Sequence, residues 1–143
     1  MFQRILLAWD GSEVALRAFD VAIDITRRYQ ASLQAVSIAY SPAHAETSAD
    51  RAESAVAAQR YLLETFERAR DRAERAGIDV EHEVIEGEPP ARTLLAHADA
   101  HGFDLIVCGH HHGRRAGRLL LRGVAEALVA DATTPVLVVS EDS

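Results

Sequence analysis

Apolar and polar residues follow two alternating spacings along this chain, one typical of strands and one typical of helices. Five short runs rich in Val, Ile, Leu and Ala predict β-strands at residues 3–9, 32–39, 78–85, 104–108 and 135–140. Between them, apolar residues three or four positions apart predict helices at residues 13–29, 54–76, 89–101 and 118–131. Strand and helix therefore alternate through the whole chain.

This alternation predicts a single α/β domain, residues 1–143, with a mostly parallel sheet and right-handed crossovers. The unbroken apolar run at 105–107 is typical of a central strand, and the alternating run at 78–85 is typical of an edge strand. A strand order of 3-2-1-4-5 would bring the loop after the first strand next to the loop after the fourth. We expect residues 40–53, which are small and polar, to form a mobile loop.

Composition narrows the class of protein. The net charge of −7 argues against nucleic-acid binding, which requires a basic surface. The apolar run at residues 5–9 is too short for a signal peptide or a membrane span, and the single cysteine permits no internal disulfide, so we expect a cytoplasmic protein without membrane contact. All fifteen basic residues are arginine, which excludes a Walker-type phosphate loop and Schiff-base chemistry.

The segment 108–115, Cys-Gly-His-His-His-Gly-Arg-Arg, holds the most distinctive chemistry of the chain. It follows the predicted central strand, at the edge where open α/β sheets bind ligands. Backbone N–H groups there, with those at a helix start near Gly123, would suit an anion such as phosphate. An unperturbed histidine changes charge near neutral pH, so this cluster is expected to modulate anion affinity; an affinity that stays flat from pH 6 to 8 would refute this.

Several segments resemble the universal stress protein family, in order and over nearly the whole chain. They are AWDGSE at 8–13, the turn at Gly87, DLIV at 104–107, the glycine loop, VAE at 124–126 and TPVLVV at 134–139. The resemblance implies a five-stranded α/β fold of order 3-2-1-4-5, like the adenine nucleotide alpha hydrolases. It also implies a homodimer through the last strand, formed by Val136, Leu137, Val138 and Val139, and an unpaired apolar edge there would favour aggregation.

Many members of the family bind ATP, through Gly, two residues, Gly, nine residues, Gly and then Ser or Thr. Without gaps from Gly109, this chain places His112 at the second glycine, Arg122 at the third and Gly123 at the hydroxyl residue. A shift of one residue recovers Gly113 and Gly123 but puts Val124 at the hydroxyl position. The loop is closer to the A-type branch of the family, which does not bind ATP. The resemblance therefore implies a degenerate site for ATP or another adenine nucleotide, with Mg²⁺, formed by Asp10, Gly11, Ser12, Val36, Gly109, His110, His112, Gly113, Arg122, Gly123 and Val124.

Two interpretations are open for most of these groups. The arginines at 114, 115, 118 and 122 would hold phosphate oxygens in place of the lost glycines, or form a solvated turn. Asp10 would contact a nucleotide ribose or a metal-bound phosphate, as the resemblance implies, or form an Asx-turn at the first helix. Trp9 is expected in the core.

Metal binding and catalysis have little support. Three consecutive histidines cannot easily converge on one ion, His97 and His101 lack the glutamate of a metalloprotease, and Cys108 is expected to be a buried thiol. Slow ATP hydrolysis is the most that we expect. Two functions follow: a nucleotide-binding stress-response module, or a dimeric interaction module of the same fold that binds no nucleotide.

Overall fold

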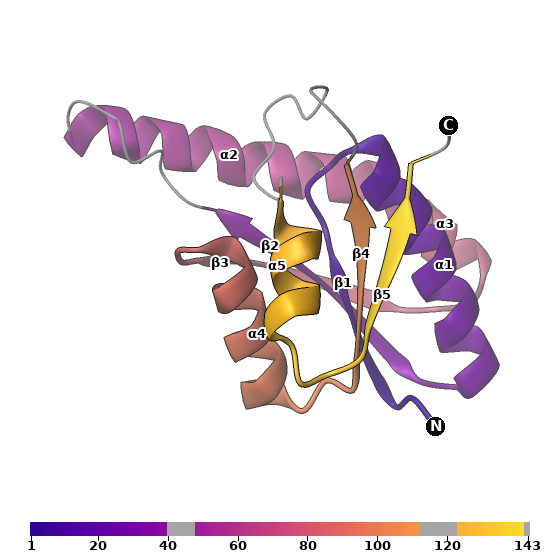
Figure 1. The fold of residues 1–143 in the computed structure, drawn as a ribbon. Helices are drawn as coiled ribbons and strands as arrows, with labels where there is room; N and C mark the ends of the chain where they lie inside the picture. Colours follow the sequence, from indigo (N-terminus) through magenta and orange to yellow (C-terminus); the bar gives the residue numbers. More distant parts are fainter. Residues whose placement is uncertain (40–47, 112–122, 142–143) are drawn as a thin grey trace.

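The computed structural model describes residues 1–39, 48–111 and 123–141, with only the backbone for 48–52 and 54. Its sheet has five parallel strands in the order β3-β2-β1-β4-β5, as predicted. The strands are β1 (Arg4–Ala8), β2 (Ser32–Ala39), β3 (Val80–Glu86), β4 (Leu105–His110) and β5 (Val136–Ser140). Figure 1 shows β1 and β4 side by side in the middle of the sheet, with β5 at one edge.

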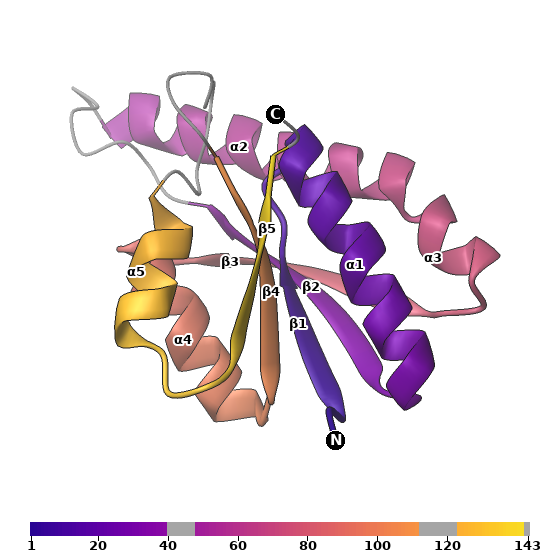
Figure 2. The same ribbon diagram turned by 45° about the vertical axis from the view of Figure 1, so that its right-hand side comes forward.

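Helices cover both faces of the sheet (Figure 2). One face carries α1 (Glu13–Tyr29), α2 (Ser48–Ala69) and the short α3 (Asp71–Arg75), and the other carries α4 (Pro90–His101) and α5 (Val124–Asp131). Alternate residues of each strand supply the two cores. In β1, Ile5 and Leu7 pack under α1 and α2, whereas Leu6 and Ala8 pack under α4 and α5.

The long helix differs from its prediction at both ends. It begins at Ser48, so the part of the predicted loop at 48–53 is helical, while residues 40–47 lie outside the described residues. Alanine, glutamate and arginine dominate this stretch, and their helix propensity outweighs its polarity. The helix ends at Ala69, and a turn at Arg70 separates it from α3. The Arg70 guanidinium there donates to the carbonyl of Val80 and lies over the Phe66 ring.

The last crossover also differs from its prediction. Strand β4 continues through Gly109 and His110, because these residues pair with Val139 and Ser140 of β5. Helix α5 begins at Val124, because Gly123 before it has a φ of +76°, which no helix interior accommodates; residues 118–122 of the predicted helix lie outside the described residues. Among the described residues, no helix combines the length and apolar character that crossing a membrane requires.

Candidate functional site

The topology brings the carboxyl ends of β1 and β4 together at one edge of the sheet. Leu7 pairs with Val107 in the parallel register, so the chain leaves both strands at the same height. Strand β1 lies where the sheet changes winding direction, with β2 on one side and β4 on the other. Open α/β sheets bind ligands in the crevice at this point.

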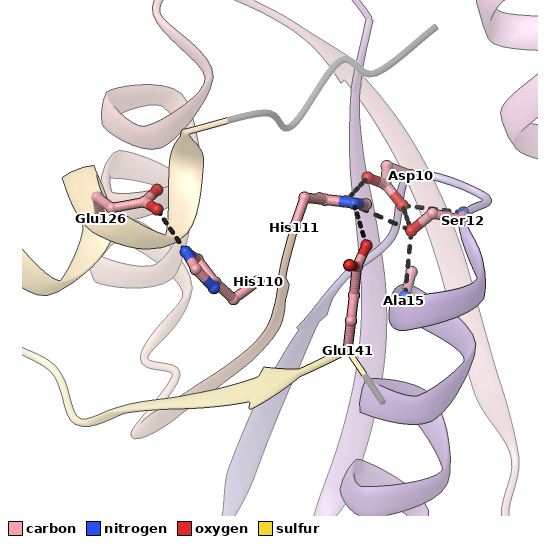
Figure 3. A network of polar contacts seen from close by, with 7 residues as sticks. All are labelled: Asp10, Ser12, Ala15, His110, His111, Glu126 and Glu141. Carbon is pink, nitrogen blue, oxygen red and sulfur yellow. Dashed lines mark hydrogen bonds and ion pairs between the residues drawn. The ribbon is translucent and has the colours of Figure 1, made fainter. Parts of the chain in front are cut away.

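Asp10 is the buried acid of this edge, with only 2% of its surface exposed. Its Oδ1 accepts hydrogen bonds from the backbone N–H and the hydroxyl of Ser12, which is the Asx-turn that the sequence suggested. The cap of α1 is Ser12 rather than Asp10, since the Ser12 Oγ accepts from the N–H of Ala15. Asp10 therefore has one fixed oxygen and one oxygen that faces away from the helix (Figure 3).

Gly11 makes this turn sterically feasible. Its φ is +82°, and a Cβ there would lie 2.9 Å from both the Thr65 Oγ1 and the Tyr61 Cε1 of α2. Glycine alone among the residues avoids both the strain and the overlap. The predicted site residue Gly11 thus has a packing role that needs no ligand.

His111 occupies the second oxygen of Asp10 (Figure 3). Its Nε2 lies 2.9 Å from Asp10 Oδ2 and 3.5 Å from Ser12 Oγ, and its Nδ1 lies 3.6 Å from Glu141 Oε1 beyond β5. The side chain is only 7% exposed. The hydrogen bond to Asp10 raises the pKa of His111, burial opposes this, and the charges of Asp10 and Glu141 reinforce it.

His111 was absent from the predicted site, which named its two neighbours instead. A signal for it exists in the sequence, because alternate strand residues share a face. Leu105 and Val107 face α1 and α2, and continuing the alternation through Gly109 puts His111 on the same face. His112, with Gly113 and Arg122, lies outside the described residues.

His110 points to the opposite face of the sheet. Its Nε2 lies 2.5 Å from Oε1 of Glu126, in the first turn of α5 (Figure 3). The pKa of Glu126 is lowered, first by a hydrogen bond from its own backbone N–H and then by His110. Predicted site residues Gly123 and Val124 lie at the start of this helix, with Val124 buried. His110 therefore links β4 to α5 rather than to Asp10.

Gly109 lies where α1 crosses β4. A Cβ at this position would come within 2.9 Å of Val14 Cγ1 and 3.1 Å of the Val14 backbone carbon. The cavity between Gly109, Asp10, His111 and Val124 is about 10 Å³. Such a volume holds about one water molecule, so in this conformation the Asp10 carboxylate is not open to a nucleotide.

Val36 lies within β2, fully buried among the residues under α4 and α5. Its carbonyl accepts the backbone N–H of Trp9, which continues the pairing of β1 with β2. The backbone contact of Val36 to a nucleotide stays a prediction. Trp9 itself is in the core as expected, 2% exposed, and donates its Nε1–H to Thr65.

Cys108 is buried, and the two histidines of α4, His97 and His101, pack against each other. Burial, with a smaller contribution from Glu126, raises the pKa of the Cys108 thiol to about 12, so no thiolate forms near neutral pH. The His97 and His101 rings stack at 4.2 Å, and His97 Nε2 lies 3.3 Å from the Gln34 Oε1. The described part of the chain contains no group of three or more His, Cys, Asp or Glu side chains placed to hold a metal ion.

Comparison with known proteins identifies the family. The sequence profile of the universal stress protein family matches residues 1–140. A universal stress protein of Thermus aquaticus is 34% identical over 140 residues, covering 97% of this chain and 99% of the relative. One of Methanocaldococcus jannaschii is 30% identical over 143 residues, covering 99% of this chain and 84% of the relative.

Solved structures agree with this relationship. A member of the family from Burkholderia pseudomallei has a TM-score of 0.79 and 27% identity, with 96% of each chain covered. A universal stress protein in complex with cAMP has a TM-score of 0.72 and 29% identity, covering 96% of this chain and 97% of its own. The chain belongs to the universal stress protein family.

Proposed function

We propose that this protein is a stress-response module that binds an adenine nucleotide at the carboxyl ends of β1 and β4. The observation that carries the proposal is Asp10, a buried carboxylate at the point where the sheet changes winding direction. Its Oδ1 is held by Ser12, and its Oδ2 faces the side chain of His111 rather than the protein backbone. A carboxylate so placed is suited to accept the hydroxyl hydrogens of a ribose.

The start of α5 adds the second half of such a site. Gly123 is its N-cap residue and has no side chain to cap the backbone N–H groups that follow, of which the N–H of Glu126 bonds to its own carboxylate. N–H groups at a helix start attract anions, which suits the phosphate of a nucleotide. The relative solved with cAMP, at 29% identity, supports the same ligand class. Mg²⁺ and phosphate contacts by the arginines at 114, 115, 118 and 122 remain predictions.

One observation favours the alternative function, an interaction module without a nucleotide. His111 lies on Asp10, and the cavity beside it is about 10 Å³. Binding therefore requires His111 to leave this position. If it never does, the protein acts through its surface alone.

Titration calorimetry with Mg-ATP, AMP and cAMP distinguishes the two functions. We expect saturable binding by the wild-type protein and its loss in Asp10→Ala. Asp104→Ala is the matched control, because Asp104 also accepts two hydrogen bonds, from the N–H groups of Gln3 and Arg4, but at the opposite end of β1. Absence of saturable heat up to millimolar ligand, with the protein folded, would leave only the interaction module.

We also propose that the protein is a homodimer through β5. Val136, Leu137 and Val138 remain half-exposed in this edge strand, which leaves apolar side chains and backbone groups for a partner. In sedimentation, Val136→Lys should shift the protein to the monomer. Val129→Lys, at the exposed Val129 of α5, should leave the dimer intact. A monomeric wild-type protein would contradict the proposal. A cytoplasmic location and at most slow ATP hydrolysis stay predictions.

A further inference from the structure

The His111 side chain contacts the same carboxylate, Asp10, that we propose for a bound nucleotide. Its ring is 7% exposed and lies between Asp10 from the turn after β1, Ser12 at the start of α1 and Glu141 after β5 (Figure 3). A ring nitrogen donates to the oxygen of Asp10 that a ribose hydroxyl would use. The chain and the proposed ligand therefore compete for one acceptor.

We propose that the His111 imidazole is an internal occupant of the Asp10 subsite, and that an adenine nucleotide reaches Asp10 only by displacing it. The inference rests on the proposed function and extends it, because it names the residue that sets the affinity. His111 is the first residue after β4, so its side chain is not held by the strand pairing that ends at His110.

The charges around His111 couple its displacement to the loss of a proton. Carboxylates approach it from two elements, Asp10 before α1 and Glu141 after β5, and Glu126 of α5 acts on the same imidazole across β4. His110 is the neighbouring cation when it is protonated, and it is held by Glu126. From α2, the residues that pack on Gly11 are Tyr61 and Thr65, whose side chains end in hydroxyl groups. The carboxylates therefore favour the imidazolium while it occupies the subsite.

A displaced His111 leaves Asp10 and Glu141 and returns towards the ordinary pKa of a solvated histidine, about 6.5. Between that value and the raised pKa of the occupied state, displacement releases a proton. Acid pH therefore keeps His111 on Asp10 and weakens nucleotide binding, so the nucleotide affinity rises with pH through this window. The largest slope for one proton is about tenfold in affinity per pH unit.

Calorimetric titration with cAMP from pH 6 to 8.5 tests the inference. Its phosphate is a diester and lacks the second ionisation, near pH 6, of a phosphate monoester, so the ligand keeps one charge across the range. For the wild-type protein we expect affinity to rise with pH, and the heats measured in two buffers of different ionisation enthalpy to report a net release of protons, at most one per cAMP bound. His111→Ala should bind more tightly than wild type at pH 6 and lose the pH dependence.

His101→Ala is the matched control, because it removes a histidine that lies in the last turn of α4 and stacks on His97 instead of contacting Asp10. It should keep the pH dependence of the wild type. His111→Gln is the second variant: it keeps an uncharged side chain beside Asp10 if alanine destabilises the protein, and it should also give a flat profile. Trp9 fluorescence reports that each variant is folded.

The outcomes separate the two proposals. Equal affinity and equal pH dependence in wild type and both His111 variants would overturn the proposal that His111 occupies the Asp10 subsite, and would leave nucleotide binding in place. Absence of cAMP, AMP and ATP binding in the wild type and in every variant would overturn both. Tighter, flat binding by the His111 variants supports both.

Discussion

Replacing Gly109 with alanine tests whether this glycine serves packing or a ligand. Gly109 lies inside β4, where alanine meets no backbone strain, so the whole effect is steric. The new Cβ would lie 2.9 and 3.0 Å from the two Val14 methyl carbons and 3.1 Å from the Val14 backbone carbon. Carbon atoms in contact prefer about 3.5–4.0 Å, so helix α1 must shift by several tenths of an ångström or more.

Overpacking of this kind costs about 1–3 kcal/mol of unfolding free energy. For a chain of this length, a loss of about 2 kcal/mol lowers the Tm by about 4–8 °C. Val14→Ala removes the two methyl contacts but not the backbone contact, so the double variant should recover part of the loss. Urea unfolding of the four proteins measures the coupling, which we expect to exceed about 0.5 kcal/mol, the limit for independent sites.

A glycine kept only for a ligand would behave differently. Gly109→Ala would then unfold at the same urea concentration as the wild type and lose only nucleotide affinity. Strict additivity with Val14→Ala would equally refute the packing argument.

Three further predictions concern the core. Cys108 should not react with a thiol reagent at pH 8 in the folded protein and should react fully in denaturant, because its pKa is about 12; rapid reaction before unfolding would contradict its burial. Burial lowers the pKa of His82 to about 4. Between pH 6.5 and about 4 the unfolded chain therefore binds a proton at His82 that the folded protein does not, so the free energy of unfolding decreases as the pH is lowered. His82→Gln should lose less stability than wild type between pH 7 and 4.5 in urea unfolding; an equal loss would exclude His82. Trp9→Phe should lower the free energy of unfolding, followed by circular dichroism, by about 1–2 kcal/mol, since Thr65 loses its hydrogen-bond donor. If that hydrogen bond is the cause, the same substitution should have almost no effect on stability in a Thr65→Val background.

The strand pattern predicted the sheet because burial on two faces imposes it. Leu6 and Leu7 of β1 are both fully buried, on opposite sides, and a continuous apolar run is the only sequence that satisfies both. Once the strands were placed, the alternation with helices left few topologies. The order β3-β2-β1-β4-β5 was therefore within reach of the sequence, and the family resemblance named it.

Element boundaries depended on information that periodicity does not carry. The extension of β4 through Gly109 and His110 is fixed by pairing with β5, which is 30 residues further along the chain. The start of α5 is fixed by the positive φ of Gly123. The early start of α2 was visible in its alanine content, but its polarity was given more weight.

The site was predicted in part. The meeting of Asp10 with the end of β4 followed from topology alone, and the structure confirms that they adjoin. Which histidine reaches Asp10 depends on the strand continuing two residues further than predicted, because that extension decides the face on which each side chain lies. His111 was therefore missed, and the contact of His110 with Glu126 was not foreseen.

The most direct test of the proposed site is a titration of ¹⁵N-labelled protein with AMP, followed by the backbone amide shifts. The account predicts saturable shifts at residues 10–12, 109–111 and 123–124, with little change at Asp104 and Gln3 at the other end of the sheet. Shifts confined to other surfaces, or none up to millimolar AMP, would contradict a nucleotide site at Asp10.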